Sequence, residues 1–271
     1  MNFRFLICSL MAVLTLISCK KENLEYNVNN TGQLKLKFDH IINGKTLVLG
    51  TSQYSNSFQE HFTIDILKYY VSNIKLTNDK GVEFILPKKE SFFLIDATNN
   101  ESLFPRFNVP EGNYTKLEFV LGVDSLTSVS PKEERTGILD IEDNDMYWSW
   151  NSGYIFFKME GESPAANTAN KRYAYHIGLF GGYDKENPTK NNIRTISIDL
   201  SKAGSATVQK DLSSDIHLMV DIGKVMDGTN KIKISEYSSV MVSGPNNLIA
   251  DNYSEMFTHD HTHNFQKISN E

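Results

Sequence analysis

The chain has 271 residues, a net charge of −6 at pH 7 and 40% hydrophobic residues. This composition is typical of a globular protein and excludes a wholly disordered chain. The chain is acidic and has no long run of lysine or arginine, so nucleic acid is not expected as a partner, because nucleic-acid binding requires a basic face.

The first 31 residues are typical of a targeting segment followed by a tether. The apolar stretch from Phe5 to Ile17 is too short for a membrane-spanning helix, which needs about 20 residues. It ends in Leu-Ile-Ser-Cys at Cys19, which resembles a bacterial lipobox. We therefore expect residues 1–18 to be a lipoprotein signal peptide and Cys19 to carry the lipid. Residues 19–31 would form the lipid anchor and flexible tether of a membrane-anchored periplasmic or cell-surface protein.

The rest of the chain has the pattern of short strands. Leu34, Leu36 and Phe38 alternate with polar residues, and Asn43-Gly44 predicts a hairpin turn. The expected strands cover residues 34–40, 46–49, 61–66, 69–76, 82–86, 92–96, 116–123, 154–157, 174–179, 193–200 and 216–221.

No long segment has the 3.6-residue period of a helix; a short helical turn is expected at 222–226 and irregular chain after Val240. This pattern predicts an all-β fold: a two-sheet antiparallel sandwich or jelly-roll-like barrel with long loops, formed by residues 32–271 as a single domain. The longest loop, residues 124–146, is the expected functional loop.

Two tryptophans mark the most aromatic part of the sequence. Trp148 and Trp150 are two residues apart, so an extended backbone would place both indoles on one face. So much aromatic area is typical of a core, and the structural interpretation is favoured from the residues alone. A functional interpretation depends on histidines that could face the pair.

Histidines are the main candidates for chemistry. His259, His261 and His263 are spaced by two, and on a strand this spacing would give a chelate suited to Cu, Zn or Ni; the alternative is a solvated polar tail. His40 and His176, each taken alone, are more typical of hydrogen-bonded core histidines, and His61 and His217 are weaker candidates for a functional role. With Cys19 lipidated and the other cysteine in the signal segment, a metal site must use histidine, carboxylate or methionine. A few histidines with an open coordination position favour copper over structural zinc.

Other sites are less well supported by the residues. The carboxylates between Asp140 and Asp145 could bind Ca²⁺, but their spacing does not match an EF-hand loop, and a solvated acidic loop is the favoured interpretation. The chain has no Gly-X-Ser-X-Gly, His-Glu-X-X-His or P-loop motif. We therefore do not expect an enzyme.

Several segments together resemble the MbnP family of secreted copper-binding proteins, in the lipoprotein form of Bacteroidetes-type bacteria. The resemblance covers nearly the whole chain from Gly32 and rests on Phe38-Asp39-His40, Leu67–Ile74, Val109–Tyr114, Gly122–Ser125, Met146–Tyr154, Tyr175–Gly178 and Asn252–Phe257. It implies a β-rich fold with a histidine copper site. Carried over, the ligands would be His40, His176, His261 and His263.

In some members of that family a partner di-haem protein related to MauG oxidises a tryptophan to kynurenine. The resemblance makes Trp148 or Trp150 the candidate for this modification. The sequence thus predicts a copper-binding lipoprotein for storage, delivery or homeostasis. Two alternatives remain: a non-catalytic β-sandwich module that binds a glycan or a protein, and a metal-dependent enzyme with residues 124–146 as a lid.

Overall fold

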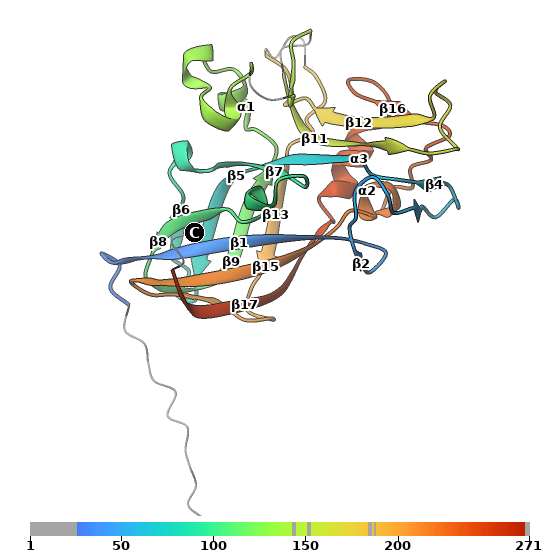
Figure 1. Cartoon of the computed structure of the whole chain (residues 1–271). Coiled ribbons are helices and arrows are strands. Elements are labelled where there is room, and N and C mark those ends of the chain that lie inside the picture. Colours follow the sequence, from blue (N-terminus) through green and yellow to red (C-terminus); the bar gives the residue numbers. More distant parts are fainter. Residues whose placement is uncertain (1–25, 143–144, 151–152, 184–185, 187, 269–271) are drawn as a thin grey trace, which may run out of the picture.

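A computed structural model describes residues 26–142, 145–150, 153–183, 186 and 188–268. Two curled sheets face each other (Figure 1), with the first in the lower half of the view and the second above it. The expected signal peptide and Cys19, the residue expected to carry the lipid, lie outside the described residues.

The first sheet has five strands, with the order β17-β15-β1-β2 and with β8 also paired to β1. Its central pair, β1 and β15, runs parallel, whereas β17 pairs antiparallel with β15. The strands are β1 (Thr31–Ile42), β2 (Lys45–Thr46), β8 (Arg106–Pro110), β15 (Leu212–Asp221) and β17 (Phe257–Lys267).

The second sheet has ten strands, with the main order β13-β9-β5-β11-β12-β16. Those strands are β13 (Arg194–Asp199), β9 (Gly112–Leu121), β5 (Ile66–Asn78), β11 (Gly153–Glu162), β12 (Arg172–Gly178) and β16 (Ser239–Val240). The others are β6 (Glu83–Ile85), β7 (Phe92–Asp96), β10 (Tyr147–Trp148) and β14 (Ala206–Val208). Here β12 and β16 run parallel.

The remaining elements are short. Strands β3 (Tyr54–Ser55) and β4 (His61–Phe62) form a separate hairpin, and the α-helices are α1 (Ser125–Ser128), α2 (Lys224–Asp227) and α3 (Asn246–Tyr253). Helices α2 and α3 pack together at one end of the sandwich (Figure 1). Turns of 3-10 helix cover Lys88–Glu90, Asn100–Leu103, Lys132–Glu134 and Gly137–Leu139. Among the described residues, no helix is long and apolar enough to cross a membrane.

Strand β1 shows how the sequence produces a two-faced sheet. Leu34, Leu36 and Phe38 are buried on its inner face, while Lys35 and Lys37 point outward. This alternation follows from the two-residue period of a strand. One face of β1 therefore belongs to the core, and the other is available to solvent and to polar chemistry.

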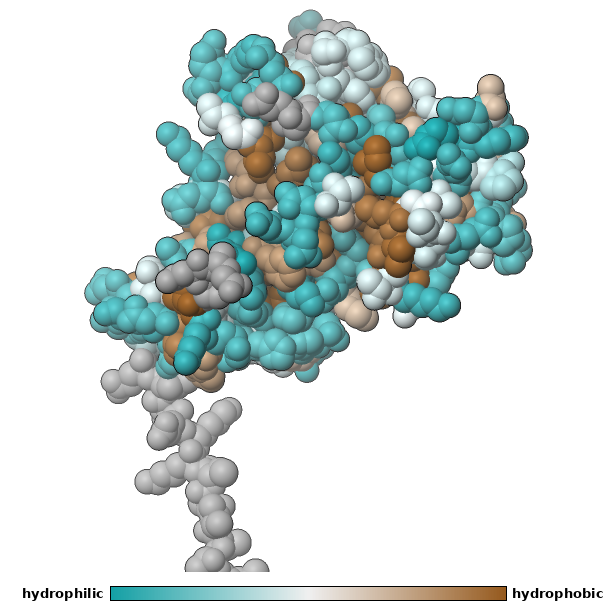
Figure 2. Space-filling model, viewed as in Figure 1, coloured by the Kyte–Doolittle hydropathy of each residue, from teal (hydrophilic) through white to brown (hydrophobic). Residues whose placement is uncertain are grey.

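The core between the sheets is mainly aromatic. The Phe38 ring makes edge-to-face contacts with Tyr69 of β5, Phe119 of β9 and Phe257 of β17, at centroid distances of 6.2, 6.2 and 6.3 Å. Such contacts add to the free energy gained by burying apolar area. In Figure 2 most of the visible face is hydrophilic, with hydrophobic residues gathered near the middle of the view.

The expected all-β sandwich is confirmed, and two of its strand pairs run parallel. The Asn43-Gly44 turn is also confirmed: both residues have positive φ, 52° and 72°, and β1 turns back onto β2. The prediction of irregular chain after Val240 is wrong, because helix α3 and the 11-residue strand β17 lie there. The apolar pattern of β17 is weak, because much of this strand carries polar side chains on both faces.

Candidate metal centre

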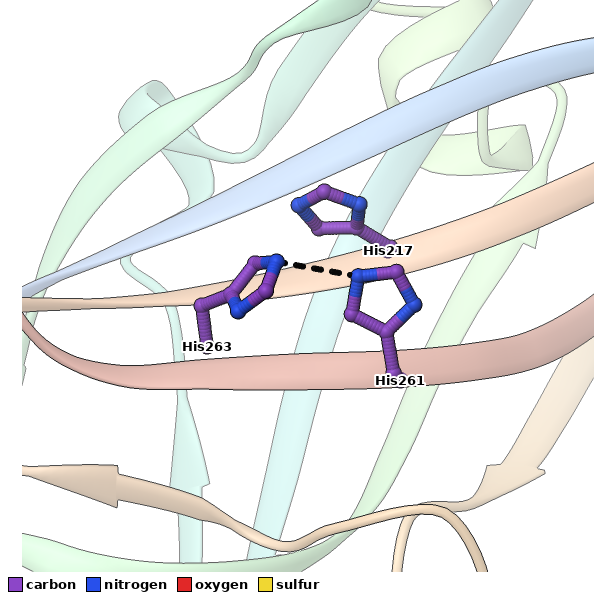
Figure 3. A group of neighbouring side chains, drawn as sticks. All are labelled: His217, His261 and His263. Atoms are coloured by element: carbon purple, nitrogen blue, oxygen red, sulfur yellow. Dashed lines mark hydrogen bonds between the residues drawn. The ribbon is translucent and has the colours of Figure 1, made fainter.

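Three histidines meet on the outer face of the five-stranded sheet. His217 lies on β15, and His261 and His263 lie on the neighbouring strand β17 (Figure 3). Each offers one ring nitrogen, and these nitrogens all lie within 4.8 Å of one another. Within the described ranges this is the only group of three or more His, Cys, Asp or Glu side chains with that spacing. Imidazole nitrogen is a common ligand for Cu, Zn, Ni and Fe.

Strand register brings the three rings together. His217 pairs directly with His261, and Asp215, two residues earlier on β15, pairs with His263. The neighbours of His217 along β15, Ile216 and Leu218, are fully buried. His217 must therefore point outward, on the same face as His261 and His263.

The rings are close enough to share one ion. The centroid of His217 lies 4.3 Å from that of His261 and 4.9 Å from that of His263, and the latter two are 4.6 Å apart. The Nε2 atoms of His261 and His263 are 3.0 Å apart, a hydrogen bond in which one ring donates to the other. Figure 3 shows both rings on the same side of β17, next to His217. His217 and His261 are half-buried and His263 is exposed, so the cluster is open to solvent.

The electrostatics favour neutral imidazole at His217. Burial lowers its pKa, and the neighbouring His261, Lys37 and His263 lower it further, against an opposing effect of Asp39. A neutral ring keeps a free lone pair for a metal. Lys37 pairs with Asp39 at 2.9 Å.

The third closely spaced histidine, His259, is not part of the cluster. A β-bulge at Asp260 shifts the register, so that His261 pairs with His217 while His259 pairs with the buried Leu218. His259 therefore faces away from the cluster, and its Nε2 is hydrogen-bonded to the Thr262 hydroxyl at 2.9 Å. The expectation that the three would point to one side is corrected for His259, because it assumed an unbroken strand.

His40 lies on β1 but on its inner face. Its side chain is buried, and its Nε2 lies 2.9 Å from the hydroxyl of Tyr69 on β5. Burial lowers the pKa of His40 to about 4, with a smaller opposing effect of Asp39. The sheet backbone thus separates His40 from the cluster on the outer face.

His176 lies in the other sheet. It is on β12, where its Nε2 lies within hydrogen-bonding distance, 2.8 Å, of the Glu160 carboxylate. The Oε1 atom of Glu160 also lies 3.6 Å from Nζ of the buried Lys158. Burial lowers the pKa of His176 despite the carboxylate beside it. Of the four ligands implied by the family resemblance, the structure brings together His261 and His263, and the third member is His217, which was not in that set.

The two tryptophans differ in exposure. Trp148 on β10 is 4% exposed, whereas Trp150 is 63% exposed, and their ring centroids lie 5.7 Å apart. Trp148 packs against Gly178 of β12: a Cβ there would lie 2.8 Å from its ring and 2.3 Å from the Tyr154 carbonyl oxygen. The Trp148 Nε1 is buried without a hydrogen-bond partner among the described residues. Trp148 is therefore part of the core, and Trp150 is part of the surface.

The acidic segment before the tryptophans is tied to lysines. Asp145 pairs with Lys68 at 3.2 Å and with Lys158 at 2.6 Å, and Glu142 pairs with Lys132. Its described carboxylates do not form a cluster with the spacing of a metal site. This arrangement agrees with the favoured interpretation of a charged surface loop rather than a Ca²⁺ loop.

Comparison with known proteins points to one family. A family model described as MbnP matches residues 31–242, a range that includes His217 and ends before β17. The solved structure of MbnP from Methylosinus trichosporium is similar, with a TM-score of 0.52, 18% identity, and coverage of 76% of this chain and 80% of that chain. At this identity the likeness shows a shared fold. A search of curated proteins found no match.

Proposed function

The chain belongs to the MbnP family, and from this premise we propose that it is a copper-binding protein that holds the ion at His217, His261 and His263. Family membership suggests a copper-related role. The observation that supports this location is the convergence of three imidazoles, with ligand nitrogens within 4.8 Å of one another, on the outer face of the first sheet.

The donor set fits copper. Three imidazoles without a thiolate suit Cu(II), which binds nitrogen ligands more tightly than the other divalent first-row metals, and they also fit the low coordination number of Cu(I). Burial and the neighbouring groups favour the neutral form of His217. Copper is cargo in this proposal: the exposed side of the cluster leaves room for a ligand from a donor or an acceptor, which supports storage or delivery.

We also propose that the protein does not catalyse a reaction itself. The carboxylates that flank the cluster already have partners: Asp39 pairs with Lys37, Asp215 with Lys35, and Asp260 with His261. A metal-dependent hydrolase would need a free general base beside the ion. Measurable copper-dependent turnover of a substrate would contradict this part of the proposal.

The experiment that tests the site is a copper titration of matched variants. We expect the full chain, purified without metal, to bind one copper per chain, and the variant with His217, His261 and His263 all changed to Ala to lose that binding. A control with His40 and His176 changed to Ala should keep it. Copper retained by the first variant and lost by the control would reject the cluster in favour of the ligands that the resemblance implied. Circular dichroism should show that the first variant folds, since the cluster is on the surface; the control must be shown to fold as well, because it removes the buried His40 side chain.

Two further features complete the proposal. The protein would be anchored by a lipid on Cys19 and face the periplasm or the cell exterior; a Cys19→Ser variant that still incorporates labelled palmitate would contradict this.

A MauG-like di-haem partner would oxidise Trp148 or Trp150 to kynurenine. The exposure of Trp150 supports access by such a partner. A tryptic peptide of unchanged mass after co-expression with a di-haem oxidase would count against the modification.

A second candidate function is glycan binding, favoured by the same exposed indole. Trp150 is 63% exposed beside Trp148, and an exposed indole could stack on the apolar face of a sugar. Titration of the Trp fluorescence with oligosaccharides, compared with the Trp150→Ala variant, separates this function from copper binding.

A further inference from the structure

Strand β7 gives the second sheet an open edge. Within the described residues β7 is paired with β5 alone, in an antiparallel register. The Ala97 N–H, just after β7, donates to the Leu67 carbonyl of β5. Hydrogen-bonded pairs alternate along an antiparallel ladder, so the main-chain groups of Phe92, Leu94 and Asp96 point to the edge away from β5.

The protein covers only the last of these three positions. The Ser102 hydroxyl lies 2.9 Å from both the amide nitrogen and the carbonyl oxygen of Asp96. The outward N–H and C=O groups of Phe92 and Leu94 have no hydrogen-bond partner in the described part of the chain. Phe92, Phe93 and Leu94 are all half-buried apolar residues. Exposed edges are usually protected by charge, proline or a bulge, and this part of β7 has none of them.

Two hollows meet at this edge. One, of about 860 Å³, is lined by Phe92, Ile138 and Leu139, and the other, of about 780 Å³, by Phe92, Phe93 and Phe104. Figure 1 shows β7 between α1 and β1, and Figure 2, from the same side, shows hydrophobic residues near the middle of the view. Side chains of an added strand would alternate between the two faces of the sheet, so neighbouring residues would enter different hollows.

The charges around the hollows favour a basic occupant. Carboxylates line both, Glu133 and Glu134 the first and Asp96 and Glu101 the second, together with Lys88, Lys89 and Arg106. Asp96 pairs with Lys68 at 3.1 Å, and Lys88 lies 3.5 Å from Asp124. Glu101, Glu133 and Glu134 have no ion pair within the described ranges. These three carboxylates are therefore available to lysine or arginine of an incoming chain.

We propose that the free edge of β7 is a docking site for an extended, basic peptide segment of another protein, which adds to the second sheet as a strand. The unpaired donors and acceptors of Phe92 and Leu94 match a polypeptide backbone, and such main-chain bonds supply affinity in strand addition. The hollows select apolar side chains at alternate positions. A second copy of this chain would bring the same three unpaired carboxylates to the groove, so it is disfavoured as the occupant. The histidine cluster lies on the other sheet, and docking does not depend on copper.

Two variants separate the main-chain donor from the side chain that carries it. Leu94→Pro removes the outward N–H without removing a bond to β5, and proline is tolerated at edge positions of this kind. Leu94→Ala, the matched control, shortens the side chain and keeps the N–H. The probe is the fluorescein-labelled peptide Lys-Thr-Val-Ile-Val-Thr-Lys, and its counterpart has Glu at both ends.

Fluorescence anisotropy with the full chain measures the affinity. We expect saturable binding of one Lys peptide per chain, weaker by about tenfold in Leu94→Pro than in Leu94→Ala, as for the loss of one hydrogen bond. The Glu peptide should bind less tightly, and the double variant Glu133→Gln with Glu134→Gln should weaken the Lys peptide by about threefold or more. In the wild type, the peptide should slow hydrogen exchange at the amides of Phe92 and Leu94.

Three results would overturn the proposal: no binding to the wild type, equal affinity of the Pro and Ala variants, or equal affinity for the Lys and Glu peptides. A concentration-dependent dimer that Leu94→Pro abolishes would overturn it in favour of a second copy as the occupant. Near-UV dichroism checks that both Leu94 variants fold. If Leu94→Pro does not fold, the exchange of the two wild-type amides decides, and unchanged rates at saturating peptide reject the edge.

Discussion

The buried His40 should make the protein less stable in weak acid. In an unfolded chain a histidine titrates near pH 6.5, whereas burial lowers the pKa of His40 to about 4 in the folded protein. The folded state therefore disfavours the charged ring, and stability that is complete above pH 6.5 is lost as the pH falls toward 4. A difference of about 2.5 pKa units at about 1.4 kcal/mol per unit gives a full loss of about 3.5 kcal/mol. About 2 kcal/mol of this is already lost at pH 5.

Urea unfolding of the metal-free chain between pH 8 and pH 5 measures this loss, with His40→Gln as the comparison. Glutamine can still hydrogen-bond to Tyr69 but does not titrate. Burial also lowers the pKa of His176, His217 and His259, so both proteins should lose some stability. The wild type should lose about 2 kcal/mol more than the variant by pH 5. Equal losses in the two proteins would refute the assignment to His40.

Three other predictions concern packing and charge. Gly178→Ala should destabilise the fold by about 1–3 kcal/mol, because the added methyl group overlaps Trp148 and nearby backbone; an unchanged near-UV dichroism of the indoles would count against this contact. Phe119→Ala, at the centre of the aromatic core, should cost about 3–5 kcal/mol in urea unfolding, while the same change at Phe265, which is 51% exposed, should cost less than about 0.5 kcal/mol. Asp145→Asn should cost about 1 kcal/mol at low salt, since its carboxylate is half-exposed, and should increase acrylamide quenching of the tryptophans; no increase would show that its two lysine pairs do not hold this segment.

Much of the fold follows from local patterns in the sequence. The alternation in β1 places Leu34 and Leu36 inside, and the Asn43-Gly44 turn supplies the positive φ angles that return the chain onto β2. These features are encoded within a few residues. The parallel pairing of β1 with β15 is not, because its paired residues lie 180 residues apart in the sequence and no local pattern specifies it.

The candidate site was only partly predictable, because it too depends on strand pairing between distant parts of the sequence. His261 and His263 are two residues apart, so a strand places both side chains on one face. His217 lies between buried residues of β15, which indicates an outward side chain, but its pairing with His261 depends on the bulge at Asp260. A bulge changes the register by one residue and has no signature in this segment. Without it, His259 would appear to be the natural third ligand.

The position of β17 gives the candidate site a mechanical consequence. This strand is the edge of the first sheet and is hydrogen-bonded within it to β15 alone. An ion held by His217 on β15 and by His261 on β17 would cross-link the two strands. Binding would then resist fraying of the edge and stabilise the whole fold, by about 2.7 kcal/mol when the free ion is at 100 times its dissociation constant. Loading would thus change the protein's resistance to proteases, and an empty chain would be the form that a cell removes first.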